Sequence, residues 1–292
     1  MRVGYFGPEG TFTHEAVLAS APTLGSPHGQ EAQLVPLPTI HDTVMAVHEG
    51  TVQRALVPIE NSVEGAVNAT LDALAIETED VAIVGEVVYP ISQCLIARSS
   101  LELSEIEVVA SHPQATGQCT RFLRTSLPDA RVMAASSTAE AVRIVAGHDG
   151  PWGALGNRLA AELYGCDVLL TGVQDEPDNE TRFVWLGHVA EPGAAGARGA
   201  PGASRAVWKT AIVFWGPGAE APGWLVACLS ELASREVNLT RIQSRPRKQG
   251  LGRYMFFADL EGAASDAHVA AALEGLRGHV EVLRVLGSFP LS

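Results

Sequence analysis

The chain has 292 residues, of which 47% are apolar, and a formal net charge of −13. This length allows one to three domains with a sizeable core, and the acidic balance argues against nucleic acids and anionic membranes as partners. No apolar run approaches the roughly 18 residues that a membrane helix needs, and the N-terminal stretch lacks a hydrophobic leader, so we expect a soluble, cytoplasmic protein.

Strand-like and helix-like segments alternate along the N-terminal part of the chain. Short apolar segments predict strands at 3–6, 55–59, 106–110, 132–135, 152–155, 168–171 and 183–186. Helical segments are predicted at 13–21, 42–49, 67–74, 116–127, 139–146 and 159–164. This alternation predicts an α/β architecture with mostly parallel sheets.

The segment 81–97 interrupts the alternation, because it contains two predicted strands with no helix between them. The interruption indicates two lobes rather than one continuous sheet. We therefore predict one large domain at 1–189, with lobes at roughly 1–80 plus 180–189 and at 81–179.

The stretch 190–207 is rich in Ala, Gly and Pro and is predicted to be a linker. Beyond it, 208–292 forms a second predicted domain. Its elements follow the order strand, helix, strand, strand, helix, strand, at 209–215, 224–235, 239–244, 254–260, 266–276 and 280–287. This βαββαβ order is that of the ferredoxin-like unit.

Polar loops follow several predicted strands at their carboxyl ends, where open α/β sheets bind ligands. The loops are GPEGTFTHEA, ENSVEGA, SHPQATGQC, SSTAEA and GNRLAAE. Each runs into a predicted helix and presents free backbone N–H groups and the positive end of a helix dipole. Several such ends bind a carboxylate without any lysine. Thr13, Ser62, Thr116 and Thr138 are equally compatible with simple helix capping.

The stretch DNETRF places an amide, a hydroxyl and a guanidinium before a predicted strand. Asn179 can donate hydrogen bonds, Thr181 offers a hydroxyl, and Arg182 supplies a permanent cation for an anion. The structural alternative is a turn whose arginine pairs with a carboxylate.

Two residue types limit the chemistry. The only lysines are Lys209 and Lys248, so the first 207 residues offer neither a P-loop lysine nor a Schiff-base lysine. No GxGxxG motif follows a predicted strand, so a nicotinamide cofactor has no support. The four cysteines are Cys94, Cys119, Cys166 and Cys228, and they lie far apart in the sequence. We expect them to be free thiols rather than parts of a metal site or of disulfides.

Four motifs occur in a fixed order, namely GPEGTFT, PIENSVEG, SHPQATGQC and DNETRF, and QSRPRKQGLGRYMFFADLEG follows them. Together they resemble the prephenate dehydratases that carry a C-terminal ACT domain, and the resemblance covers nearly the whole chain. It implies conversion of prephenate into phenylpyruvate, water and carbon dioxide in phenylalanine biosynthesis, without a cofactor or metal. It also implies a two-lobed catalytic domain that resembles periplasmic binding proteins.

The resemblance implies residue roles as well. Thr181 matches the threonine that the family regards as catalytic. The motif positions for substrate contact are Thr11, Glu60, Asn61, Ser62, Ser111, Gln118, Asn179, Arg182 and Phe183. The ACT domain is expected to bind phenylalanine as effector through Gly223, Trp224, Leu225, Asn238, Leu239, Gln243, Ser244, Arg245 and Pro246. Family members of this kind are homodimers or homotetramers.

Two positions depart from the family pattern at the expected effector site. Gln243 replaces the glutamate of the family's ESRP motif, and Trp224 stands where a small residue is usual. Three outcomes for feedback by phenylalanine therefore stay open: it is weakened, it responds to another effector, or it is lost. Two other functions also stay open, namely arogenate dehydratase and a non-catalytic amino-acid sensor.

Overall fold

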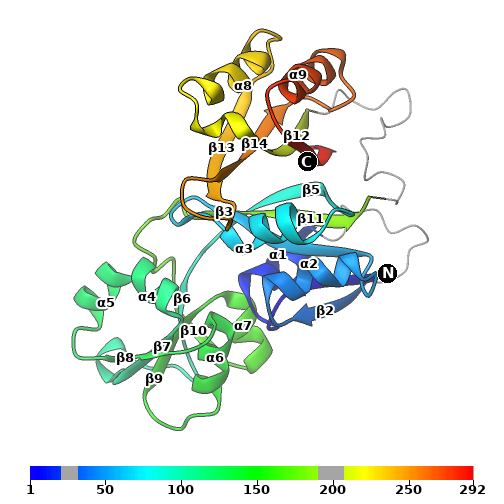
Figure 1. Ribbon diagram of the computed structural model, residues 1–292. Coiled ribbons are helices and arrows are strands. Elements are labelled where there is room, and N and C mark those ends of the chain that lie inside the picture. The colour runs from blue at the N-terminus through cyan, green and yellow to red at the C-terminus, as the bar shows by residue number, and fades with distance from the viewer. Residues whose placement is uncertain (21–31, 190–206, 292) are drawn as a thin grey trace. The chain divides into compact units, whose positions relative to one another are not determined.

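The computed structural model of the protein describes residues 1–20, 32–189 and 207–291 (Figure 1). The predicted linker at 190–207 lies outside the described residues, apart from Val207. Two compact units are present: the first comprises Met1–Thr43, Leu56–Val67 and Val87–Phe183, and the second comprises Val44–Ala55, Asn68–Glu86 and Val184–Ser292. Within the described ranges, no helix has the length and apolar character that crossing a bilayer requires.

The first sheet has the strand order β2-β1-β3-β11-β5, with β4 added to β3. Its strands are β1 (Arg2–Phe6), β2 (Gln33–Leu37), β3 (Arg54–Asn61), β4 (Gly65–Ala66), β5 (Val81–Pro90) and β11 (Glu180–His188). The helices in this part are α1 (Phe12–Ser20), α2 (Ile40–His48) and α3 (Asn68–Asp72), and α3 continues as a π-helical turn, Ala73–Glu77. Strand β2 was not predicted, because it is a half-exposed edge strand that contains Pro36.

The second sheet has the order β10-β6-β9-β7-β8. Its strands are β6 (Cys94–Ala97), β7 (Val108–Ser111), β8 (Arg131–Ala134), β9 (Trp152–Gly156) and β10 (Asp167–Thr171). Its helices are α4 (Pro113–Gln118), α5 (Thr120–Ser126), α6 (Thr138–Ala146) and α7 (Arg158–Tyr164). The helix predicted at 116–127 is therefore two short helices, which meet at Cys119, where the φ angle of −118° leaves the helical range.

The expectation of mostly parallel sheets is wrong for one side of this second sheet. Strand β7 runs parallel to β8 and β9, but β6 runs antiparallel to both β9 and β10. Two strands that follow each other in the chain and pair in parallel need a crossover connection, usually a helix. Strand β6 follows β5 without an intervening helix, so its direction is free of that constraint.

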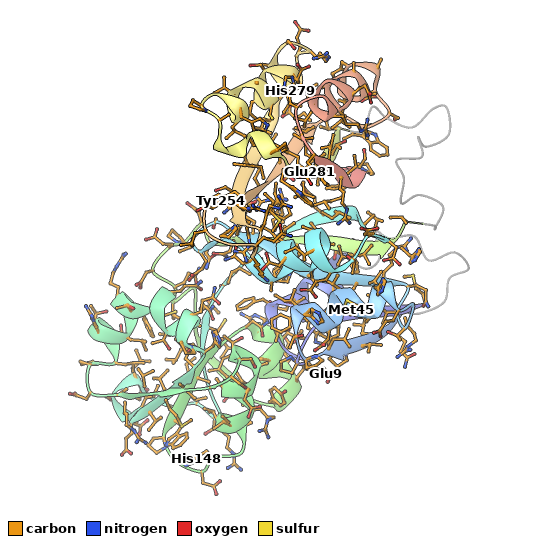
Figure 2. All side chains as sticks on the ribbon, viewed as in Figure 1. Glu9, Met45, His148, Tyr254, His279 and Glu281 are labelled. Atoms are coloured by element: carbon orange, nitrogen blue, oxygen red, sulfur yellow. The ribbon has the colours of Figure 1, made fainter. Side chains whose placement is uncertain are left out.

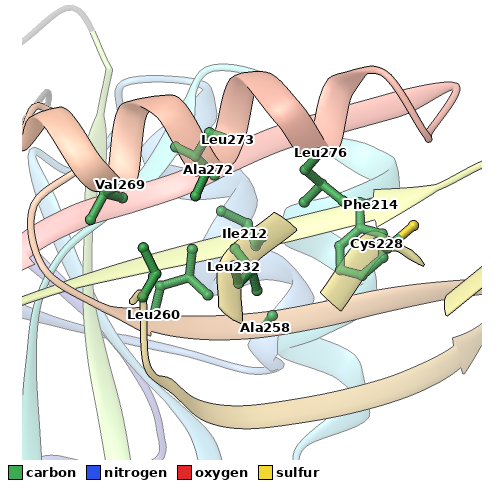
Figure 3. Packing of buried hydrophobic residues seen from close by; sticks show 11 residues of the cluster. Ile212, Phe214, Cys228, Leu232, Ala258, Leu260, Val269, Ala272, Leu273 and Leu276 are labelled. Atoms are coloured by element: carbon green, nitrogen blue, oxygen red, sulfur yellow. The ribbon is translucent and has the colours of Figure 1, made fainter. Parts of the chain in front are cut away.

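The C-terminal part confirms the predicted ferredoxin-like topology. Its elements are β12 (Trp208–Trp215), α8 (Trp224–Ala233), β13 (Leu239–Pro246), β14 (Tyr254–Glu261), α9 (Ala267–Arg277) and β15 (Val282–Pro290), in the strand order β13-β14-β12-β15. Helices α8 and α9 lie side by side (Figure 1). Side chains of α9, including Val269, Ala272 and Leu276, point toward the sheet and pack with Ile212 and Phe214 of β12 (Figure 3).

Within the second unit, arginines of this β-sheet bind the segment around α3. Arg245 donates two hydrogen bonds to the Asp72 carboxylate, at 2.7 and 2.6 Å, and Lys248 Nζ lies 2.9 Å from the same group. Arg284 donates to the carbonyl oxygens of Ala75 and Thr78 at 2.9 and 2.6 Å. These carbonyls belong to the end of the π-helical turn, where backbone oxygens lack partners within the helix.

Asp72 is the most strongly paired carboxylate of this contact. Burial raises its pKa, but the hydrogen bonds from Arg245 and Lys248 outweigh burial, and the pKa of Asp72 lies below its usual value. A carboxylate whose pKa is lower in the folded protein stabilises the fold above the unfolded-state pKa of about 3.9. That stabilisation is lost as the pH falls through the lower, folded-state pKa.

We expect Asp72→Asn to lower the free energy of unfolding by about 1–3 kcal/mol at pH 7, because Arg245 then lacks its charged partner. The difference from the unmodified protein should shrink toward pH 3, since the native carboxylate is then becoming protonated. Urea unfolding at several pH values measures both effects. The control is Glu274→Gln, which removes an exposed pair with Arg277 and should change stability little. A loss that does not vary with pH would contradict the assigned charge pairing.

Candidate active site

A pocket of about 280 Å³ lies within the first unit, at the carboxyl ends of β1, β3, β7 and β8. Its polar lining residues are Thr11, Thr13, Asn61, Gln93, His112, Gln114, Gln118, Ser136, Ser137, Thr138 and Thr181. Its larger apolar lining residues are Phe6, Phe12, Ile40, Pro58, Val67, Ile91 and Phe183. Four of the five polar loops noted in the sequence thus reach one pocket, and the loop at 156–162 is the exception.

Helices α1, α4 and α6 begin at this pocket. In each helix one N-terminal backbone N–H group is capped by a side chain, which belongs to Thr11 in α1, His112 in α4 and Ser137 in α6. Each cap comes before the hydroxyl residue that the sequence marked as a candidate, namely Thr13, Thr116 and Thr138. No lysine or arginine is among the described lining residues. Positive potential for an anion therefore comes mainly from the dipoles and free N–H groups of the longer helices α1 and α6.

Asn61 lies at the centre of a chain of amide side chains beside the pocket. Its Oδ1 atom accepts hydrogen bonds from the backbone N–H groups of Val63 and Glu64, at 3.0 and 2.9 Å. Its Nδ2 atom therefore has to face acceptors, and it donates to Asn179 Oδ1 at 2.7 Å and to Thr181 Oγ1 at 2.9 Å. Since the Thr181 oxygen accepts this bond, the Thr181 hydroxyl proton can be donated to a ligand.

The same donor direction continues away from Asn61. Asn179 Nδ2 donates to Gln118 Oε1 at 3.2 Å, and Gln118 Nε2 donates to Glu64 Oε1 at 3.4 Å. Gln93 Nε2 also donates to Gln118 Oε1, at 3.4 Å. The two backbone N–H groups at Val63 and Glu64 thus determine which way each amide in the chain is turned.

Thr181 lies in a strand and not in a turn. The sequence predicted a strand that starts at Phe183, whereas β11 begins at Glu180. Successive side chains of a strand point to opposite faces, so Thr181 and Phe183 line the pocket while Arg182 does not. Arg182 Nη1 instead lies 3.7 Å from Glu60 Oε2. The structural alternative for this arginine, pairing with a carboxylate, is what the structure shows.

The expected substrate-contact residues therefore form two groups. Thr11, Asn61, Gln118, Thr181 and Phe183 line the pocket. Glu60, Ser62, Ser111, Asn179 and Arg182 do not line it, and they hold the surrounding chain.

Ser62 and Ser111 illustrate the second group. Ser62 Oγ accepts from the backbone N–H of Glu180 at 2.9 Å and donates to the carbonyl of Asp178, so it ties β3 to β11. Ser111 is fully buried, and its hydroxyl donates to the carbonyl of His112 at 3.1 Å. Both hydroxyls stabilise loops whose neighbouring residues face the pocket.

Sequence reasoning missed several lining residues. His112, Gln114 and Ser136 to Thr138 lie in loops that were recognised, but their positions were not selected as substrate contacts. Gln93 had no signal for a pocket position, because it stands in the short connection between β5 and β6. Strand β5 belongs to the first sheet and β6 to the second. Gln93 reaches the pocket wall because it lies in the connection between the two sheets.

Gly10 and His14 hold the loop that carries Thr11. Gly10 adopts a φ angle of +83°, which favours glycine, and its N–H donates to His14 Nδ1 at 3.1 Å. The His14 ring stacks on Tyr5 at 4.8 Å. Burial lowers the pKa of His14, so the neutral ring that accepts from Gly10 is the favoured form at neutral pH.

The four cysteines are free, as predicted, and three of them are buried, the exception being the half-buried Cys166. Burial raises the pKa of the Cys119 thiol to about 12, which leaves it unreactive as a nucleophile. In the described ranges no group of three or more His, Cys, Asp and Glu residues could hold a metal ion.

The expected effector residues of the C-terminal part do not share one face of its sheet. Strand β13 pairs Ser244 with Phe256 and Arg245 with Met255, and directly opposite residues share a face. Ser244 therefore lies on the helix-covered side with Leu239 and Pro246. Gln243 and Arg245 lie on the other side, where Arg245 binds Asp72.

Trp224 is held in the aromatic cluster of this part of the chain. Its ring lies 6.3 Å from Phe214 and 5.9 Å from Phe256, and its Nε1 donates to the carbonyl of His279 at 2.8 Å (Figure 2 labels His279). Gly223 caps the start of α8 with a φ angle of +85°, and Leu225 packs against the core. The exposed Asn238 accepts a hydrogen bond from Glu261 through its backbone carbonyl.

Comparisons with known proteins point to one family. The family model described as prephenate dehydratase matches residues 3–191. The prephenate dehydratase of Amycolatopsis methanolica is 40% identical over 291 residues, which are 99% of this chain and 88% of the relative.

Two solved structures are similar along the whole chain. The crystal structure of prephenate dehydratase from Arthrobacter aurescens in complex with L-Phe is 36% identical, with a TM-score of 0.84 over 99% of this chain and 89% of the other. GqqA, described as a novel type of quorum quenching acylase, is 27% identical, with a TM-score of 0.83 over 100% and 98%. The family match and the identity to curated relatives establish that the chain belongs to the prephenate dehydratase family.

Proposed function

We propose that this protein converts prephenate into phenylpyruvate, water and carbon dioxide, as a step of phenylalanine biosynthesis. The observation that carries the proposal is the hydrogen bond from Asn61 to Thr181 at the wall of a pocket whose described lining residues include no lysine or arginine. This bond leaves the Thr181 hydroxyl as a proton donor toward a ligand. A donor of this kind is what the reaction requires at its departing oxygen.

The bond changes of the reaction explain this need. Prephenate carries a ring carboxylate, a pyruvyl carboxylate and a ring hydroxyl. The bond to the ring carboxylate breaks, its electrons enter the ring, and the carbon–oxygen bond to the hydroxyl breaks at the opposite ring carbon. One proton converts the departing hydroxide into water, and the ring becomes aromatic. The protein must therefore bind a dianion and stabilise negative charge on one oxygen.

Thr181 is the residue that we assign to the departing oxygen. A threonine hydroxyl is a weak acid, so the main effect is a hydrogen bond that strengthens as charge develops on the oxygen. Accepting the bond from Asn61 polarises the Thr181 hydroxyl and makes it a better donor. Water replaces any proton that Thr181 transfers.

The absence of lysine and arginine from the described lining fits the decarboxylation. The ring carboxylate leaves as neutral carbon dioxide, so a strong cation on it would stabilise the substrate more than the transition state. The N-termini of α1 and α6 attract the carboxylates with partial charges instead. We propose that they bind the pyruvyl carboxylate and that the remaining expected contacts, including Arg182, act through the surrounding loops.

The chain's similarity to a quorum quenching acylase raises a second activity. Acyl transfer needs a nucleophile that a neighbouring base deprotonates. Thr181 instead receives a hydrogen bond from the Asn61 amide, which cannot take its proton. We therefore favour the lyase reaction, and an acylase assay on the same preparation would detect the alternative.

We propose that the C-terminal βαββαβ part is an ACT domain that binds phenylalanine as a regulator. We also propose the boundaries 1–189 for the catalytic domain, 190–207 for the linker and 208–292 for the ACT domain. Strand β11 pairs in the first sheet, which supports the assignment of 180–189 to the first lobe. Strand β5 pairs in the same sheet, so we propose that 81–90 also belongs to the first lobe.

A homodimer or homotetramer in the cytoplasm completes the proposal. Four unpaired thiols suit a reducing compartment. Sedimentation of the purified protein tests the assembly, and cell fractionation tests the location.

Thr181→Ala should lower kcat for prephenate by at least about 100-fold, because a positioned proton donor contributes that much or more. KM should change little, since the carboxylates are bound elsewhere. Thr181→Ser keeps the hydroxyl and should retain part of the activity. Formation of phenylpyruvate, followed by ultraviolet absorbance, measures all three rates. Full activity of the alanine variant would remove the role of Thr181.

Asn61→Asp should lower kcat by about 100-fold or more, because the new carboxylate oxygen would accept from Thr181 rather than donate to it. The Thr181 proton would then point away from the substrate. The matched control is Asn68→Asp, the same change at an exposed residue, which should leave kcat within about twofold. Equal rates for both variants would show that the direction of the amide chain has no part in catalysis.

L-Phenylalanine should lower the rate of prephenate turnover and change the sedimentation coefficient. Gln243→Glu should strengthen the response, because a carboxylate binds the ammonium group of phenylalanine more tightly than an amide does. Titration of phenylalanine against rate and sedimentation, for both proteins, is the measurement. If neither protein responds in either assay, the C-terminal part does not bind phenylalanine as a regulator.

A further inference from the structure

Gln93 is a buried pocket residue whose side chain carries an unpaired acceptor, as far as the described residues show. The residue lines the pocket and its side chain is only 2% exposed. Its backbone is held from both sides, since its N–H donates to Gln174 Oε1 at 2.9 Å and its carbonyl accepts from Val173 N–H at 3.0 Å. Its side-chain Oε1 has no hydrogen-bond partner among the described residues.

The orientation of this amide follows from the chain of hydrogen bonds that begins at Asn61. Gln118 presents its Oε1 to Gln93, because the same oxygen already accepts from Asn179 Nδ2. Gln93 must therefore present Nε2 to Gln118, since the reverse orientation would set two acceptors against each other. The Gln93 oxygen is consequently the end of the amide chain that has no hydrogen-bond partner in the described part of the protein.

An unsatisfied buried acceptor is costly, by roughly 1–3 kcal/mol, and at a pocket wall a bound ligand can remove that cost. The prephenate dianion has few groups that can donate a hydrogen bond to this acceptor. Both of its carboxylates and its keto oxygen are acceptors, and the ring hydroxyl is its only hydrogen-bond donor.

We propose that Gln93 Oε1 accepts a hydrogen bond from the ring hydroxyl of prephenate, the group that departs in the reaction. The inference rests on the proposed function. The oxygen is shielded in the present conformation, so a small rotation about the last side-chain torsion of Gln93, which is a soft torsion, brings it to the substrate. Thr181 donates to the departing oxygen and Gln93 accepts from it, so the two residues orient the same hydroxyl from both sides.

This arrangement distinguishes substrate from product. Phenylpyruvate retains the pyruvyl carboxylate and the ring but has no hydroxyl. Gln93 should therefore contribute to the binding and turnover of prephenate and contribute nothing to the binding of phenylpyruvate. A residue that only supports the pocket wall would affect both compounds.

The test is Gln93→Met, which preserves length and removes both polar atoms. We expect kcat/KM for prephenate to fall about 10- to 100-fold, the effect of losing one buried hydrogen bond to a reacting group. The inhibition constant of phenylpyruvate should stay within about twofold. The matched control is Gln33→Met, the same substitution at an exposed residue of β2 that does not line the pocket, and it should retain most of kcat/KM.

A second variant, Gln93→Glu, gives a pH signature. The protonated carboxyl group can donate to Gln118 and accept from the hydroxyl, as the amide does, whereas the ionised group repels the dianion. Its kcat/KM, relative to that of the unmodified protein at the same pH, should therefore rise as the pH falls through the pKa of the introduced carboxyl group. Circular dichroism confirms that both variants are folded.

The outcomes separate the inference from the proposed function. Unchanged kcat/KM in Gln93→Met, equal weakening of prephenate and phenylpyruvate, or an equal loss in Gln33→Met would each overturn the role of Gln93. An unmodified protein that forms no phenylpyruvate from prephenate would overturn the proposed function instead.

Discussion

The two backbone N–H groups that bind Asn61 Oδ1 are the constraint on which the pocket chemistry depends. They leave the amide only one orientation, and each neighbouring amide then has to match it. Thr181 becomes an acceptor toward the protein and a donor toward the ligand as a result. We propose that this weakly acidic hydroxyl can act in the reaction because the surrounding dipoles are oriented before the substrate arrives, so little reorganisation is needed.

The pocket combines these oriented amides with helix N-termini, and its lining, as far as the structure describes it, includes no lysine or arginine. Partial charges are weaker than a guanidinium, yet they suit a reaction in which a carboxylate loses its charge. Arg182 shows how the fold enforces this choice. Thr181 and Arg182 are adjacent in sequence, so their side chains point to opposite faces of the strand. The Arg182 side chain therefore lies near Glu60 and not on the face of Thr181.

The second unit contains a different use of charge. Arg245 and Arg284 of the C-terminal β-sheet bind Asp72 and the end of the π-helical turn that follows it. Asp72 belongs to α3, which in the chain follows the loop that carries Asn61. These bonds therefore fix β13 to α3 within the second unit.

The sequence alone determined the α/β class, the βαββαβ order of the C-terminal part and the loops that meet at the pocket, because apolar periodicity and helix starts are local signals. It did not reveal the strand at 33–37, the reversed direction of β6 or the division of DNETRF between two faces, since these depend on which strands become neighbours. Gln93 is the clearest case. Its position between two strands is visible in the sequence, but only the tertiary structure places its amide against Gln118 and leaves its oxygen without a hydrogen-bond partner among the described residues.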